Sequence, residues 1–226
     1  MKKTLLAAII CAVTAISPLF GQAHTQSLSF SDPGPLNGAT GQAFTVSVLL
    51  DFEGYGSFGL SYWLEVQNAL APFLTITGAT YFTFPDPNQL SPNPAPFNGG
   101  AAMGASPGFM LEQRDLGATV NDPTMKFVSP GANHHITDIT FMLAPGAPLG
   151  MYNLRSTTLF PRISEVTDTD FNDNNIIPAG SVTLNIVPEP STLALLCLAA
   201  AGAGLVAYRR RRAALQNQFA SRSSNG

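Results

Sequence analysis

The chain has 226 residues, with 11 Lys and Arg against 14 Asp and Glu, and a formal net charge of −3 at pH 7. Between residues 24 and 187, four basic residues stand against 13 acidic ones, so this region carries a formal charge of −9. Such a region disfavours nucleic-acid binding, because phosphate contacts need clustered Lys and Arg. Both cysteines, Cys11 and Cys197, lie in apolar terminal segments, so the region between them has no disulfide, thiolate metal site or cysteine nucleophile.

The N-terminus has the order of features found in a secretory signal peptide. Two lysines follow Met1, residues 5–16 are apolar, and the small residues at 21–23 suit signal peptidase. We therefore predict that residues 1–23 are removed by signal peptidase and that the mature chain begins near His24.

Residues 24–186 are predicted to form one all-β domain, an antiparallel β-sandwich. Apolar and polar residues alternate along its short segments, which places one face in a core and the other toward water. Clusters of Gly, Pro, Asn and Asp separate these segments. About eight or nine strands with jelly-roll or Greek-key connections are expected. The apolar runs are 28–31, 44–50, 58–66, 74–84, 108–114, 136–143, 152–160 and 181–187.

Two pairs of these segments resemble the strand signatures of cohesin-like domains, which are relatives of carbohydrate-binding modules. Residues 41–48 are followed by 58–64, and residues 136–141 are followed by 150–154. The chain departs from the family where Trp63 stands in place of a strand-ending aspartate. The resemblance implies the sandwich fold, and it offers a carbohydrate-binding adhesin as an alternative function.

Residues 85–107 differ from the rest of the domain. They contain six prolines and almost no apolar periodicity. We expect a long surface loop between strands, since structureless loops of this length are otherwise uncommon. A tolerated insertion without a role is an equal interpretation, because each doubling of loop length costs only about 0.6 kcal/mol.

One acidic segment is a candidate calcium site. Asp168, Asp170 and Asn172 follow the D-x-D-x-N spacing that presents oxygens to Ca²⁺. The remainder departs from an EF-hand, because Asp173 replaces the turn glycine and Ala179 replaces the bidentate glutamate. A solvated turn rich in Asp and Asn is the alternative. No other cofactor is expected.

Aromatic residues offer a candidate sugar-binding surface. Trp63, with Tyr55, Phe58 and Tyr62 nearby in sequence, would stack on sugar rings if exposed. Trp63 is expected on the strand face opposite Phe58 and Tyr62. Aromatic residues of sandwiches more often belong to the core, which is the competing interpretation.

Three patterns that resemble catalytic motifs are not expected to act in catalysis, so we predict that the protein is not an enzyme. The G-x-S-x-G match at 104–108 fails because Pro107 has no N–H to offer an oxyanion. His134 and Asp138 are expected on one strand face, with His135 on the other, in a polar strand start. A glycosidase pair made of Glu53 and Glu65 depends on a separation that the sequence does not fix.

The C-terminus carries three features in order: a Pro-Glu-Pro motif, an apolar run of 16 residues at 193–208, and a basic cluster. As a helix the run reaches about 24 Å, at about 1.5 Å per residue. This is short for a hydrocarbon core of about 30 Å, so we predict a short transmembrane helix aided by local thinning of the bilayer. The arginines place the tail 213–226 in the cytoplasm. The predicted processing residues are Val187, Pro188, Glu189 and Pro190, and the membrane-stop residues are Arg209, Arg210, Arg211 and Arg212.

Residues 187–212 resemble the PEP-CTERM sorting signal of Gram-negative surface proteins. The resemblance implies that exosortase, a membrane-embedded cysteine transpeptidase-like enzyme, recognises the segment. It also implies export, an inner-membrane intermediate, and a final place at the cell surface or outside the cell. We therefore predict a structural protein of the cell surface or extracellular matrix, associated with exopolysaccharide and biofilm. A glycan-active enzyme is the last alternative, and an ordinary C-terminal anchor is the competing interpretation of the segment.

Overall fold

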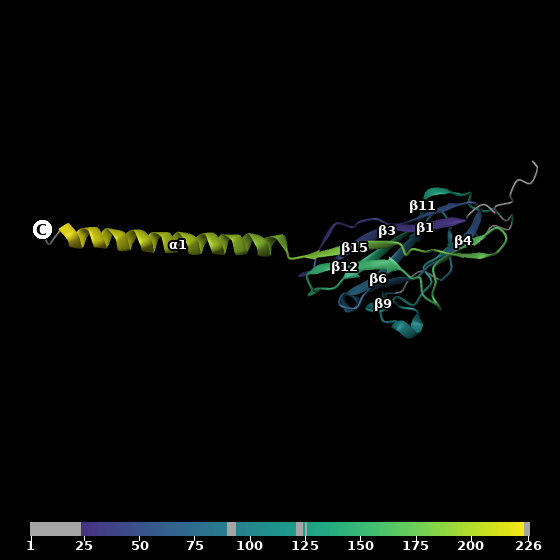
Figure 1. The fold of residues 1–226 in the computed structure, drawn as a ribbon, viewed down its shortest axis with the longest axis horizontal. Helices are drawn as coiled ribbons and strands as arrows, with labels where there is room; N and C mark the ends of the chain where they lie inside the picture. Colours follow the sequence, from purple (N-terminus) through teal and green to yellow (C-terminus); the bar gives the residue numbers. More distant parts are fainter. Residues whose placement is uncertain (1–23, 90–93, 121–123, 125, 224–226) are drawn as a thin grey trace, which may run out of the picture.

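A computed structural model describes residues 24–89, 94–120, 124 and 126–223 (Figure 1). The predicted signal peptide, residues 1–23, lies outside the described residues. The described chain forms a β domain followed by one long helix, and Figure 1 shows this helix extending away from the domain.

Three five-stranded sheets build the domain. The first contains, in spatial order, β1 (Thr25–Phe30), β3 (Gln42–Glu53), β11 (Gly131–Leu143), β6 (Leu74–Tyr81) and β8 (Ala95–Pro96). The second contains β2 (Pro35–Asn37), β15 (Ser181–Val187), β12 (Gly150–Ser156), β5 (Leu64–Gln67) and β9 (Phe109–Leu111). The third contains β14 (Asp173–Asn175), β13 (Glu165–Asp168), β4 (Ser57–Ser61), β10 (Ala118–Thr119) and β7 (Asp86–Pro87). Neighbouring strands are antiparallel, except that β2 runs parallel to β15.

One apolar core joins the sheets. Alternation along β3 buries every second side chain from Phe44 to Phe52, and the side chains between them are exposed or half-buried. The same cluster includes Leu154 and Leu184 of the second sheet and Val166 of the third. Each such side chain contributes about 1.5–3 kcal/mol on burial. The predicted antiparallel β-sandwich is confirmed.

The predicted number of strands, eight or nine, was too low. Each predicted run contains a strand, but the described residues hold fifteen, and the additional ones are two to four residues long, too short to show a period. The run 58–66 also breaks into β4 and β5, which belong to different sheets. At the break the Tyr62 N–H donates to Asp115 Oδ1 at 3.1 Å. The Trp63 carbonyl accepts a hydrogen bond from the Thr157 N–H at 3.0 Å.

The described part of segment 85–107 is more than a surface loop. Ala95 and Phe97 are buried, and β8 pairs with β6 through Pro96 and Thr75. The short 3₁₀ helix η3 (Ala101–Met103) follows, and Ala105 is buried behind it. The surface-loop prediction was therefore wrong for this part, because small and aromatic residues scattered among prolines enter the core without any periodicity. A second 3₁₀ helix, η2 (Ala71–Phe73), precedes β6.

The C-terminal helix α1 (Pro190–Ser223) forms where a helix was predicted, and its side chains from residue 194 to residue 212 are exposed. Among the described residues, however, we find no helix whose length and apolar character would suffice to cross a membrane. The transmembrane span predicted at 193–208 lies within α1 and stays a prediction.

Candidate functional site

The candidate sorting segment begins inside the β domain. Strand β15 is paired on both sides, with β12 and with β2, and Val187 is its last residue. The Val187 carbonyl accepts a hydrogen bond from the Gly38 N–H at 3.1 Å. Only Pro188 and Glu189 separate this strand from Pro190, the first residue of α1. Proline suits that first helical position, because its missing N–H has no partner there in any case.

The ends of several strands meet beside Val187. Gln42 at the start of β3 pairs with Leu143 at the end of β11, and Leu143 pairs in turn with Leu74 at the start of β6. The turn after β2 is bonded to the turn before β12, since the Gly38 carbonyl accepts hydrogen bonds from Gly146 and Ala147 at 2.8 and 3.1 Å.

We call this region the uncharged end of the domain, and it consists of residues 35–42, 71–75, 142–151 and 184–187. None of these residues is Asp, Glu, Lys or Arg. Three large apolar side chains are nevertheless exposed there, Met142 at 44%, Leu149 at 56% and Met151 at 73%. Met151 points outward from β12 opposite Asn185 of β15.

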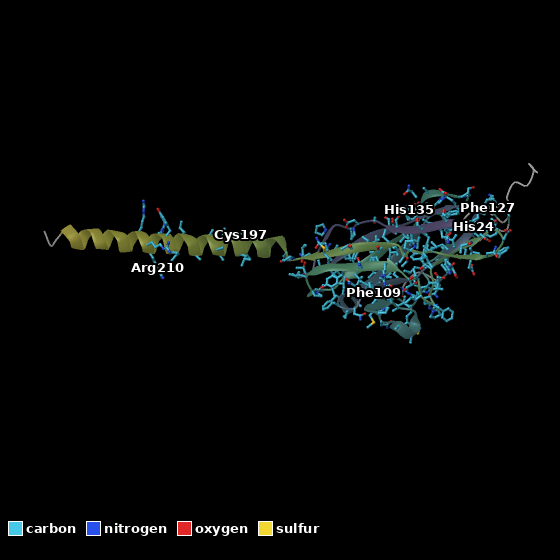
Figure 2. All side chains as sticks on the ribbon, viewed as in Figure 1. His24, Phe109, Phe127, His135, Cys197 and Arg210 are labelled. Atoms are coloured by element: carbon cyan, nitrogen blue, oxygen red, sulfur yellow. The ribbon has the colours of Figure 1, made fainter. Side chains whose placement is uncertain are left out.

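The other end of the domain is strongly acidic. We call residues 51–56 and 165–175 the acidic end, and they contain six carboxylates and no Lys or Arg. A hydrogen bond from the Thr169 N–H to the Gly56 carbonyl, at 3.1 Å, joins the two segments. Figure 2 shows His24 and Phe127 on this side of the domain, away from α1.

Asp168 organises the acidic end. Its side chain is 2% exposed, and its Oδ1 accepts hydrogen bonds from the backbone N–H groups of Asp170 and Asn172 at 2.8 and 2.9 Å. The side-chain amides of Asn172 and Asn174 donate to Oδ2 at 3.2 and 3.3 Å. Burial alone raises the pKa of Asp168, but the hydrogen bonds from Asn172, Asn174 and Asp170 outweigh it and hold the pKa below its ordinary value.

These contacts bear on the calcium hypothesis. A calcium site needs free oxygen ligands, whereas both Asp168 oxygens already accept N–H donors. Asp170 is exposed. Among the residues that the structure describes, no group of three or more His, Cys, Asp or Glu side chains is arranged to hold a metal ion. The arrangement is a hydrogen-bonded turn between β13 and β14, in which Asp168 is buried and residues 170–173 are exposed.

Trp63 is not the exposed aromatic surface that sugar stacking requires. Its side chain is 8% exposed and packs with Ala105 and Leu111 in a small second cluster. The Arg162 guanidinium lies 5.4 Å from the centre of the ring. Tyr62 is fully buried. The exposure that sugar stacking requires of Trp63 is therefore not met, because Ala105, Leu111 and the Arg162 guanidinium pack against the ring.

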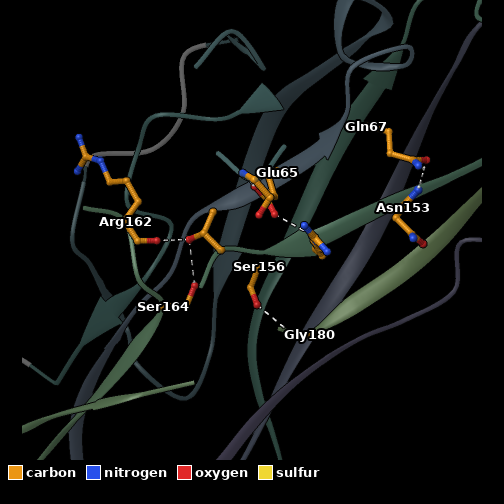
Figure 3. Close-up of polar contacts among 10 residues, drawn as sticks. Glu65, Gln67, Asn153, Ser156, Arg162, Ser164 and Gly180 are labelled. Atoms are coloured by element: carbon orange, nitrogen blue, oxygen red, sulfur yellow. Dashed lines mark hydrogen bonds and ion pairs between the residues drawn. The ribbon is translucent and has the colours of Figure 1, made fainter. Parts of the chain in front are cut away.

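Two buried glutamates near the edge of the second sheet are each held by an arginine. Glu65 Oε1 accepts a hydrogen bond from Arg155 Nε at 2.7 Å, and its Oε2 accepts the Ser106 N–H at 2.6 Å (Figure 3). Glu112 Oε1 accepts a hydrogen bond from Arg114 Nε at 2.7 Å. Burial raises the pKa of Glu112, and its bonds with Arg114 offset this only in part. Sequence reasoning did not predict that Glu112 is buried and paired, and the only available signal was its position directly after an apolar strand.

The structure does not assemble the other catalytic patterns. Glu53 is exposed at the end of β3, whereas Glu65 is buried in β5 of another sheet. The expected face-sharing of His134 and Asp138 was wrong. His135 Nε2 instead lies 2.8 Å from Asp138 Oδ1, because β11 carries irregularities at 131–137 that interrupt the alternation. The His134 ring packs on Phe52, with 5.1 Å between ring centres.

The geometry thus defines a class of protein: a folded β domain whose last strand leads directly into a C-terminal sorting segment. Residues 187–212 match the PEP-CTERM protein-sorting motif. The motif implies export and membrane-associated sorting, with exosortase as the processing enzyme. No curated protein matches the chain.

Solved structures similar to this one include cohesin modules. A cohesin module from a Clostridium perfringens ATCC13124 family 33 glycoside hydrolase is 15% identical, with a TM-score of 0.45, and the likeness covers 74% of this chain and 100% of that one. The third ScaB cohesin of R. flavefaciens, solved with a group 1 dockerin, is 13% identical, with a TM-score of 0.42 and coverage of 72% and 96%. The seventh ScaB type I cohesin from Pseudobacteroides cellulosolvens is 14% identical, with a TM-score of 0.38 and coverage of 73% and 95%. The likeness concerns the fold alone.

Proposed function

We propose that this is an exported bacterial protein that exosortase processes at its C-terminal signal, and that the product has a non-catalytic, structural role at the cell surface or in an exopolysaccharide matrix. The observation that carries the proposal is the sorting motif at 187–212, which starts at the last residue of β15. The β domain is then the cargo, and the segment after the Pro-Glu-Pro motif is the part to be removed.

The local geometry suits recognition by a processing enzyme. The hydrogen bond to Gly38 and the pairing of β15 hold Val187 in place. Pro188 and Pro190 each have a fixed φ angle, so the backbone on both sides of Glu189 has little conformational entropy to lose when the glutamate is bound. A sorting enzyme therefore meets a segment whose position relative to the domain is already set.

The polar clusters of the domain support a structural role. Glu65 is engaged with Arg155 and with the Ser106 N–H, and Glu112 is engaged with Arg114. Asp168 holds a turn through its hydrogen bonds. These carboxylates have contacts that stabilise the fold, which is the ordinary role of buried and paired groups.

The sorting step is tested with Glu189→Ala in the native host. Intact-mass measurement is expected to find the wild-type product without the segment from about residue 193 onward, and the variant with that segment retained. Asp170→Ala, which removes an exposed carboxylate at the acidic end, serves as the control and is expected to be processed normally. Normal processing of Glu189→Ala would contradict recognition through this motif.

The matrix role is tested with the mature product recovered from the same host. We expect wild-type protein to fractionate with the exopolysaccharide and Glu189→Ala to stay with the cell membranes. Saturable binding of the pure product to the polysaccharide would favour the carbohydrate-binding adhesin. Release of sugar fragments would contradict a non-catalytic role.

A further inference from the structure

The uncharged end presents apolar side chains to solvent beside the sorting segment. Leu149 lies in the turn before β12, and among the described residues of the β domain only Phe160 is a more exposed large apolar side chain than Met151. Both are close to Val187 in the fold, because Gly150 pairs with Ile186. Exposed apolar side chains that gather on one surface can mark a site of contact with a protein or a membrane.

The length of the connection limits what this end can touch. From Val187 to Pro190 the chain spans at most about 11 Å, and from Pro190 to residue 193 the helix rises about 4.5 Å. The apolar part of α1 therefore starts within about 15 Å of the end of β15. The leucines of α1 whose side chains the structure describes, Leu195, Leu196, Leu198 and Leu205, are exposed. Apolar residues occupy every side of the run 194–208 instead of forming one stripe. Such a helix needs an apolar environment along its whole circumference.

The distribution of charge over the β domain determines which of its ends can approach an anionic lipid surface. The region 24–187 has a formal charge of −9 and would be repelled by anionic lipid headgroups if it approached them with its carboxylates. Strand β3 runs from the uncharged end to Glu53 at the acidic end, a length of about 36 Å. This is several times the Debye length of about 8 Å at physiological ionic strength. The uncharged end can therefore approach an anionic surface without this repulsion.

We propose that the uncharged end rests on the headgroup region of a phospholipid bilayer while the sorting segment is still attached, with Leu149 and Met151 as the contacting side chains. This proposal rests on the membrane-associated sorting described above and adds the orientation of the domain. The acidic end then points away from the bilayer. The bilayer contact holds Glu189 at the depth of the headgroups, two residues beyond the strand that carries the domain.

The test uses the full chain with Cys11→Ser and Cys197→Ala, and one new cysteine that carries an environment-sensitive fluorophore. The new cysteine is Leu149→Cys or Met151→Cys at the uncharged end, and Asp170→Cys at the acidic end is the matched control. The probe is a vesicle of phosphatidylethanolamine and phosphatidylglycerol that contains a lipid with a nitroxide on its headgroup. We expect the nitroxide to remove most of the fluorescence at 149 and 151 and little of it at 170. Equal quenching at both ends would overturn the proposal.

Two further variants make the result specific. A fluorophore at Thr40→Cys, also on the uncharged end, is expected to lose its quenching when Leu149→Ser and Met151→Ser are added, although α1 is unchanged. If the fluorescence at Thr40→Cys instead changes without vesicles and with protein concentration, the surface pairs two copies of the chain and the proposal is wrong. Glu189→Ala is expected to keep the quenching, so failure of processing and failure of the bilayer contact give different results.

Discussion

The two ends of the β domain are stabilised in different ways. At the uncharged end only uncharged groups hold the turns: the Gly38 carbonyl accepts two N–H groups, and Asn37 Oδ1 accepts the Ala39 N–H at 2.9 Å. Gly41 lies against the end of β11. At the acidic end a single buried side chain, Asp168, accepts several N–H donors. The comparison teaches that the end next to the sorting segment should be insensitive to pH, whereas the opposite end should depend on a titrating group.

Gly41→Ala is expected to have the largest effect. Gly41 has a φ of +70°, and a Cβ there would press on the Leu143 carbonyl oxygen and lie 2.8 Å from the Pro145 nitrogen. Left-handed strain and a clash with backbone atoms together should lower the free energy of unfolding by about 4 kcal/mol. Urea denaturation measures this. Gly100→Ala is the control, since its Cβ would meet nothing within 4 Å, and a comparable loss in the control would contradict the assignment.

Asp168→Ala is expected to rank second. It leaves the donors of Asp170, Asn172 and Asn174 without their acceptor, which should lower the free energy of unfolding by about 3 kcal/mol. Asp170→Ala removes an exposed carboxylate and should change it by less than about 0.5 kcal/mol. Both are measured by urea denaturation in a chelator. If millimolar Ca²⁺ raises the melting temperature of the wild type and Asp168→Ala abolishes the rise, the segment binds calcium and the turn interpretation is incomplete.

The pH dependence separates the two ends. The folded-state pKa of Asp168 lies below its ordinary value, so its contribution to stability is fully present above about pH 4 and is lost as the pH falls through the folded-state pKa. The difference in unfolding free energy between wild type and Asp168→Asn should therefore shrink as the pH is lowered below about 4. The difference caused by Gly41→Ala should stay constant. A Gly41→Ala difference that also shrinks would show that the two ends do not differ in this way.

The double variant Leu149→Ser and Met151→Ser should have the smallest effect on the fold. Both side chains are largely exposed, so the free energy of unfolding should change by less than about 0.5 kcal/mol. Thermal melting without lipid measures this. A loss of more than about 1 kcal/mol would show that the two residues support the fold, since surface changes away from special features rarely cost that much.

The sequence predicted the long strands well because alternation is a local signal, as β3 and β15 show. It did not show that the run 58–66 changes sheets at Tyr62 and Trp63, since a change of partner leaves the alternation intact. It misplaced His135 because strand irregularities are set by pairing with β3. The sorting segment could be found because its features follow one another in sequence. The uncharged end and the acidic end could not be found from the sequence, because each brings together segments that are distant in the chain.

The most direct test of the central claim, that this chain is a sorted protein cut after its last strand, is the intact mass of the wild-type product at the surface of the native host. The account predicts a product that contains the β domain through Val187 and lacks the basic cluster at residues 209–212. Recovery of surface protein that still carries those arginines would contradict it.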